Sequence, residues 1–141
     1  MIIGDDPGKM TGLFIFGGYD LNRIELPALE AADEVFRCLN VHTGPHHIHA
    51  ERFIMQSKKQ TQQPDALEHI GQLKWIANYF GASFKLHSRS ERARVTREQL
   101  MNIGWWSPGK DHVNQAARCA LLGLVIHDSN HDLVRRAFGT I

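Results

Sequence analysis

The sequence has little of several features that define whole classes of protein. Its 141 residues include only two cysteines, Cys38 and Cys119, which lie far apart in the chain. This disfavours both a disulfide-stapled secreted domain and a zinc site built on closely spaced cysteines. No apolar run approaches the ~20 residues of a membrane span, and the N-terminus lacks the basic-then-apolar pattern of a signal peptide. These absences predict a protein of the reducing cytoplasm with no membrane partner.

An excess of charge of one sign is also missing. Sixteen lysine and arginine residues nearly balance 15 aspartate and glutamate residues, so the formal net charge is +1 and does not by itself indicate a nucleic-acid-binding protein. The distribution is uneven, since residues 20–34 contain five acidic residues and one basic residue, whereas residues 85–97 contain five basic residues and one acidic residue. The basic stretch, which contains Arg89 and Arg92, fits either a phosphate-binding face or a solvated helix face with salt-bridge partners.

The chain shows no internal repeat, low-complexity tract or linker, so residues 1–141 are predicted to form a single domain. Short apolar runs broken by Pro-Gly and Gly-Gly turns predict three early strands joined as an antiparallel meander, at residues 1–6, 11–18 and 22–26. Two more strands are expected at residues 46–53 and 83–87. Helices are expected at residues 27–40, 64–80, 91–103, 111–126 and 130–138. This order predicts an α/β fold with a mixed sheet flanked by helices.

The first predicted strand ends in two adjacent acids, Asp5 and Asp6, followed by Pro7 and Gly8. Adjacent strand residues point to opposite faces, so only one of the two acids can face a site, and we expect it to be Asp6. A buried carboxylate is costly unless it is paired or binds a metal. An acid that begins a turn is common, however, so this segment alone does not establish a site.

Two further acids lie in or beside predicted elements. Glu51 lies in the fourth strand, on the same face as His49 and Phe53. Asp111 begins a helix, where N-capping is its ordinary role. If the fold brings Asp6, Glu51 and Asp111 together, their oxygen ligands suit Mg²⁺ or Mn²⁺ and the cleavage of a phosphodiester.

Histidines cluster before Glu51, at positions 42, 46, 47 and 49. His47 and His49 share a strand face with Glu51, so a transition-metal site is conceivable there. The cluster has no defined ligand spacing. We therefore interpret it as surface residues or as the approach to the acidic site.

Taken together, these motifs resemble the RuvC-type resolvases, most closely their compact phage-borne branch. The segments that carry the likeness occur in order over nearly the whole chain: Asp6-Pro7-Gly8 with Thr11-Gly12, the acid in the fourth strand, Gln63-Pro64-Asp65-Ala66-Leu67-Glu68, and Gly104-Trp105-Trp106 followed by Pro108-Gly109-Lys110-Asp111-His112 and Ala116-Ala117-Arg118. The resemblance implies a ribonuclease H-like fold with a five-stranded sheet. Its first and fourth strands would be neighbours, and the last long helix would pack across them.

The resemblance also implies an activity. Asp6, Glu51 and either Asp111 or His112 would converge on Mg²⁺ or Mn²⁺, as a site for two ions. A homodimer would nick four-way (Holliday) or otherwise branched DNA, in the cytoplasm of a host cell if the chain is phage-encoded. One position departs from the family, which usually has a further acid in the first turn of the last helix. Gln115 offers an amide oxygen there without a charge, and His112 is a candidate substitute ligand.

DNA contacts are expected by the same resemblance on the loop after Glu51. Phe53 would act as a wedge at unstacked bases or else belong to the core of the sheet. Lysines would bind phosphates. The complete expected DNA-binding set is Phe53, Lys58, Lys59, Arg89, Arg92 and Lys110. Trp105 and Trp106 are expected to pack rather than to stack on bases.

The helix at residues 64–80 carries two apolar stripes. The first, which would face the sheet, consists of Ala66, Ile70, Leu73, Ala77 and Phe80. The second consists of Leu67, Gly71 and Trp75 and needs another partner. A second copy of the chain is the simple candidate, because a twofold interface uses the same patch twice.

Three other functions compete with this interpretation. The fold supports several chemistries, so one rival is a ribonuclease acting on RNA or on hybrid strands. A second is a branched-DNA-binding protein that has lost metal affinity together with its last acid. A third, an actin-like nucleotide-binding half-domain, is disfavoured by the chain length and by the lack of a second phosphate loop.

Overall fold

A computed structural model describes residues 1–17, 20–53, 64–127 and 130–139. One five-stranded sheet, in the order β3-β2-β1-β4-β5, forms its centre. Its strands are β1 (Ile2–Asp6), β2 (Met10–Gly17), β3 (Asp20–Pro27), β4 (His47–Glu51) and β5 (Ser83–His87). The first three strands pair antiparallel, whereas β4 is parallel to both β1 and β5. The predicted mixed sheet, with the first and fourth strands as neighbours, is confirmed.

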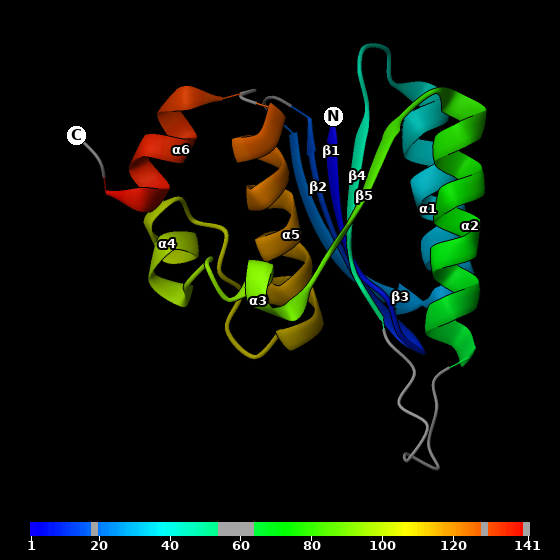
Figure 1. The fold of residues 1–141 in the computed structure, drawn as a ribbon, viewed down its shortest axis with the longest axis horizontal. Coiled ribbons are helices and arrows are strands. Elements are labelled where there is room, and N and C mark those ends of the chain that lie inside the picture. The colour runs from blue at the N-terminus through cyan, green and yellow to red at the C-terminus, as the bar shows by residue number, and fades with distance from the viewer. Residues whose placement is uncertain (18–19, 54–63, 128–129, 140–141) are drawn as a thin grey trace.

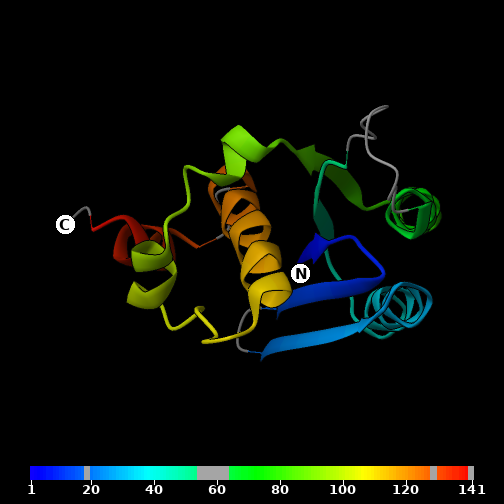
Figure 2. The same ribbon diagram turned by 90° about the horizontal axis from the view of Figure 1, so that it is seen from below.

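Helices cover both faces of the sheet (Figure 1). The helices α1 (Ala28–Val41) and α2 (Pro64–Phe80) lie on one face, and α5 (Asp111–His127) crosses the other. Three short helices, α3 (Arg89–Arg92), α4 (Arg97–Asn102) and α6 (His131–Phe138), lie on the same side as α5 (Figure 2). No helix in the described ranges combines the length and the apolar composition that a membrane span needs.

Strand alternation divides the apolar residues into two cores. Ile3, Leu13 and Ile48 face α1 and α2, whereas Ile2 and Phe14 face α5. Each buried aliphatic or aromatic side chain of this kind stabilises the fold by about 1.5–3 kcal/mol. The sheet-facing stripe of α2 is confirmed, since Ala66, Ile70, Leu73 and Ala77 are buried. The buried ring of Trp105 packs on Phe14 with 4.5 Å between ring centroids, so this tryptophan packs as expected.

Two predicted boundaries are wrong. The single helix expected at residues 91–103 is two helices, because the Thr96 side chain accepts a hydrogen bond from the backbone N–H of Gln99 and starts α4 anew. The turn before it buries Val95 completely. The strand expected at residues 46–53 ends at Glu51, since its partner β5 ends at His87, the residue opposite Glu51.

Two glycines allow the backbone of α5 to lie directly on the sheet. A Cβ atom at Gly4 would lie 2.0 Å from the carbonyl oxygen of Ala116, and one at Gly12 would lie 2.2 Å from that of His112. Any side chain at either position would push the helix outward. Because Gly12 is paired with Asp6 across β1 and β2, this contact sets the first turn of α5 beside the end of β1.

Gly12→Ala is expected to lower the free energy of unfolding by about 1–3 kcal/mol, since the added methyl overpacks a backbone contact. It should also displace His112 from Asp6. Urea unfolding measures the first effect. The control is Gly71→Ala on α2, where an added Cβ meets nothing within 4 Å and a helical alanine should stabilise by roughly 0.5–1 kcal/mol. Equal stability of Gly12→Ala and the wild type would contradict the contact.

Candidate active site

The two acids at the end of β1 point to opposite faces of the sheet. The Asp5 carboxylate faces α2, where its Oδ2 lies 2.6 Å from Nε2 of His69, and both side chains are fully buried. The Asp6 carboxylate faces α5, where its Oδ2 lies 2.9 Å from Nδ1 of His112. Asp6 is therefore the acid of this pair on the side that carries α3 and α5.

Glu51 meets Asp6 on that same face. Parallel pairing of β1 with β4 places Asp5 opposite Ala50, so the next residues along the two strands, Asp6 and Glu51, are neighbours at the strand ends. Burial is the main reason that the pKa of Asp6 rises to about 10. A hydrogen bond with Glu51, the negative charge of Glu51 and that of Asp5 raise it further. The two carboxyls thus form a crowded acidic pair in which the proton of Asp6 is favoured when no metal ion is bound.

A buried arginine completes the cluster. One terminal nitrogen of Arg92, Nη2, donates to Oε1 of Glu51 at 2.6 Å, and the other, Nη1, donates to Oε1 of Gln115 at 2.8 Å. Arg92 is only 8% exposed. It lies on α3, which begins with a capping box between Ser88 and Glu91. The guanidinium therefore links the end of β4 to the first turns of α5.

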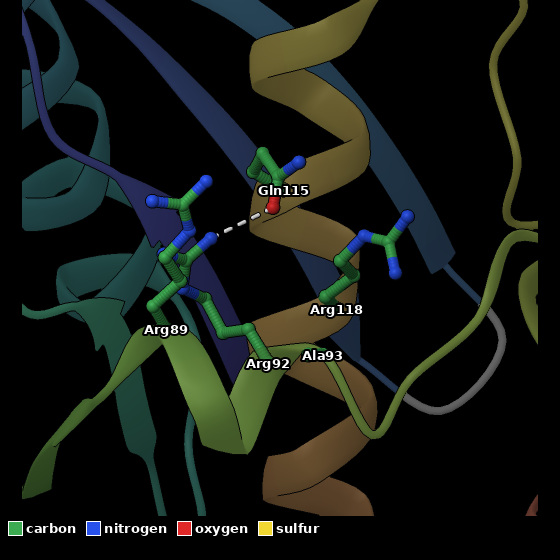
Figure 3. Close-up of a pocket in the computed structure, with 5 residues that line it drawn as sticks. All are labelled: Arg89, Arg92, Ala93, Gln115 and Arg118. Carbon is green, nitrogen blue, oxygen red and sulfur yellow. Dashed lines mark hydrogen bonds between the residues drawn. The ribbon is translucent and has the colours of Figure 1, made fainter.

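A pocket of about 180 Å³ opens beside this cluster, lined by Arg89, Arg92, Ala93, Gln115 and Arg118 (Figure 3). Burial lowers the pKa of Arg118, and the nearby charge of Arg92 lowers it further, although a guanidinium stays protonated at any physiological pH. Three guanidinium groups around one pocket favour an anion such as a phosphate. Arg118 was not predicted as a site residue, although it lies in the Ala116-Ala117-Arg118 segment of the resemblance and one helical turn after Gln115 on α5.

Of the other predicted site residues on or next to α5, only His112 contacts the acidic pair through its side chain among the contacts described. Asp111 is exposed at the first position of α5, and its charge acts on Arg118. The His112 side chain is 47% exposed and contacts Asp6. Lys110 is exposed and lines a different pocket, with Arg23.

The expected DNA-binding residues of the loop after Glu51 are only partly described. Phe53 follows the end of β4 and is partly buried. Lys58 and Lys59 lie outside the described residues. Of the remaining set, Arg89 is exposed and Arg92 is buried against Glu51, so the two basic residues of α3 have different environments.

The acidic pair fits a hydrated divalent ion better than an all-protein cage. Within the described ranges, no three His, Cys, Asp or Glu side chains are grouped closely enough to hold a metal by themselves. Mg²⁺, however, is commonly held by one or two carboxylates, several waters and the phosphate of a substrate. Asp6 and Glu51 supply two such carboxylates, and burial beside Glu51 makes the charged form of Asp6 costly unless a further cation binds there.

The histidine cluster before Glu51 is partly buried and forms a chain. Nδ1 of His49 lies 2.7 Å from Nε2 of His87, and Nε2 of His49 lies 3.0 Å from Nε2 of His127. His47 stacks on His127 with 3.6 Å between ring centroids. His49 is only 1% exposed, because Gly123 lets α5 close over it. The surface interpretation is therefore wrong for His49, which joins β4 to β5 and to α5.

The contacts among these histidines make the stability of the fold depend on pH. Burial first, and then the charges of His87 and His127, lower the pKa of His49 to about 3, against about 6.5 in an unfolded chain. Between these values the unfolded state binds a proton here and the folded state does not. The stability is therefore highest above the pKa that His49 has in the unfolded state. Below that pKa it decreases as the pH is lowered, by up to about 1.4 kcal/mol per pH unit. We expect His49→Gln to reduce the loss of stability between about pH 7 and about pH 5. Urea unfolding at several pH values measures this loss. Equal losses in the variant and in the wild type would contradict the expectation.

Comparison with known proteins identifies the fold. No protein-family model matches the chain, and no curated protein matches its sequence. Among solved structures, that of Thermus thermophilus RuvC matches with a TM-score of 0.59 and 16% identity, over 91% of this chain and 96% of that one. The same protein in complex with a Holliday junction substrate matches with a TM-score of 0.58 and 14% identity, over 91% and 95%. The chain therefore has a RuvC-like fold of the ribonuclease H-like type.

Proposed function

We propose that this protein is a metal-dependent endonuclease that cuts branched DNA, with the four-way junction as its substrate. The observation that carries the proposal is the Asp6–Glu51 pair, two carboxyls held together at the ends of neighbouring parallel strands. The fold supports it, since one structural neighbour is a RuvC bound to a Holliday junction substrate. The pocket with three arginines supports it as well, because phosphate binding requires positive charge close to the acids.

The residues have separate roles in this proposal. Asp6 and Glu51 hold Mg²⁺ or Mn²⁺, which activates water and stabilises the leaving oxygen when bound. His112 holds the Asp6 carboxylate in place through its 2.9 Å contact. Arg89 and Arg118 bind phosphate oxygens of the DNA strand. In the reaction, water adds to phosphorus while one phosphorus–oxygen ester bond breaks, leaving a phosphate end and a hydroxyl end.

A panel of labelled substrates tests this function. The purified protein is incubated with a four-way junction, an RNA–DNA hybrid and a linear duplex of matched sequence, in Mg²⁺, in Mn²⁺ and with chelator. Incision of the junction alone, abolished by the chelator, supports the proposal. Preferential cleavage of the hybrid supports the ribonuclease alternative. Tight junction binding without incision in either metal supports the binding-protein alternative.

We also propose that the protein acts as a homodimer through the second stripe of α2. Leu67 and Trp75 are exposed on this helix, Trp75 to 60%. The Trp75 ring stacks on Tyr79 at 5.3 Å and on Phe36 at 6.4 Å between centroids. Such a cluster of exposed aromatic rings is costly on a monomer. A twofold dimer would bury it and would present two equivalent acidic pairs to a nearly twofold-symmetric junction.

Trp75→Glu is expected to give a folded monomer that binds junctions poorly and loses paired incision, because a carboxylate at the centre of an apolar interface is left without a partner. Light scattering measures the mass, and circular dichroism checks the fold. Lys74→Glu, an exposed neighbour outside the stripe, is the control and should remain dimeric. A wild-type protein that is monomeric at micromolar concentration contradicts the dimer.

A further inference from the structure

We infer that the Arg92 guanidinium takes the place of a second metal cation, so that the site binds one divalent ion per chain rather than two. The inference rests on the proposed function, because it concerns the same acidic pair. It replaces the expectation of a two-metal site with a site that has one exchangeable ion and one fixed cation.

The guanidinium of Arg92 lies where a second ion would have to bind. Its two terminal nitrogens donate to Oε1 of Glu51 and to Oε1 of Gln115, at 2.6 and 2.8 Å. These oxygens, on β4 and on α5, are the ones a second ion between the two elements would need. An ion there would have to displace two hydrogen bonds, one of them to a charged carboxylate, or lie against a positive charge.

Burial and backbone hydrogen bonds hold Arg92 in this position. Only 10% of its side chain is exposed, against 27% for that of Glu51. Its backbone N–H donates to the carbonyl oxygen of Ser88, and its own carbonyl oxygen accepts from Val95, which is fully buried. The helix that carries it is fixed by the Ser88–Glu91 capping box. Removal of this guanidinium from Glu51 would leave a buried charge without its partner, which typically costs about 3–5 kcal/mol.

Little negative charge is available at this site to bind metal ions. The pair of Asp6 and Glu51 carries at most two negative charges, and Arg92 neutralises one of them. Gln115 contributes an oxygen without a charge. A single divalent ion therefore already overcompensates the side chains, and a second one would bring two more positive charges beside a fixed cation.

The pocket indicates what the fixed cation does. Arg92 is shared between the acidic pair and the pocket lined by Arg89 and Arg118. A phosphate in this pocket would lie against the Arg92 side chain, which lines it. Arg92 thus positions Glu51 for the single ion. It also presents a positive charge to the negative charge that develops on the phosphate during cleavage. Unlike a second metal ion, this guanidinium does not have to bind from solution.

The test is a count of bound Mn²⁺ ions on the protein alone, from the free-ion signal in electron paramagnetic resonance, with calorimetry as a second measurement. The wild type is expected to bind one ion per chain. Gln115→Asp is also expected to bind one, because the new carboxylate would pair with Arg92. The double variant Arg92→Gln/Gln115→Asp is expected to bind two, since it removes the fixed cation and restores an acid. Arg94→Gln removes an equal charge from an exposed position nearby and should bind one ion with unchanged affinity.

Two ions on the wild type, none on the wild type, or one on the folded double variant would each overturn the inference. If the double variant does not fold, the wild-type count and that of Arg92→Lys, which keeps the charge and should bind one ion, still decide it. The outcomes also separate the inference from the proposed function. A wild type that cuts junctions and binds two ions refutes only the inference, whereas one that binds one ion and cuts no branched DNA refutes only the function.

Discussion

Asp6→Asn and Glu51→Gln are each expected to slow junction cleavage by at least about 10³-fold, which corresponds to about 4 kcal/mol of transition-state stabilisation. Each substitution removes a ligand charge from the acidic pair and keeps the shape of the side chain. Junction binding should be unchanged or tighter, because less negative charge faces the phosphates. Single-turnover cleavage and a gel-shift assay with chelator measure the two effects separately.

Three further substitutions make this result specific. Asp20→Asn removes an exposed acid at the start of β3 and should leave the rate unchanged. Asp111→Asn and His112→Gln show which residue assists the pair; the contact between His112 and Asp6 predicts the larger loss for His112→Gln. Rates within about tenfold of wild type for Asp6→Asn and Glu51→Gln, a barrier change of about 1.4 kcal/mol or less, would refute the assignment.

His69→Leu is expected to lower the free energy of unfolding by about 3–5 kcal/mol, the usual cost of removing one partner from a buried ionic pair. His69 lies between two acceptors, Oδ2 of Asp5 at 2.6 Å and the carbonyl oxygen of Ala28 at 3.1 Å. Burial alone would lower the pKa of His69, but the hydrogen bond and charge of Asp5 raise it. Without the imidazole, the Asp5 carboxylate and the Ala28 carbonyl oxygen would each lose this hydrogen-bond partner.

Denaturant unfolding of three proteins tests this expectation. The double variant Asp5→Val/His69→Leu should lose less stability than His69→Leu alone, because no charge is then left unpaired. If the free energy of unfolding of His69→Leu is within about 1 kcal/mol of the wild-type value, which is the size of an ordinary surface effect, the pair does not stabilise the fold.

Much of the fold follows from local pattern. The alternation of apolar residues in β1 places Asp5 and Asp6 on opposite faces, and the helical stripe of α2 identifies the side facing the sheet. The adjacency of β1 and β4, and hence the meeting of Asp6 with Glu51, was expected from the resemblance rather than from periodicity, and the structure adds that the two strands are parallel. The packing of α5 on Gly4 and Gly12 then brings the first turns of that helix to the same strands.

The rest depends on contacts between distant segments, which local pattern does not encode. Arg92 reaches Glu51 and Gln115 only because the helix expected at residues 91–103 breaks and leaves α3 against α5. Which of Asp111 and His112 faces Asp6 depends on the rotation of α5, set by the close approach of Gly12 to the backbone of His112. The burial of His49 depends in the same way on Gly123.

Paired incision of a symmetric four-way junction tests the central claim most directly. The junction is labelled on each strand in turn, incubated with wild-type protein in Mg²⁺, and the products are treated with DNA ligase. We expect nicks at symmetric positions in two opposing strands, closed by the ligase to give two intact duplexes, and no incision when a chelator is present. An intact junction in both Mg²⁺ and Mn²⁺, with the protein folded and bound to it, would contradict the claim that this site cuts branched DNA.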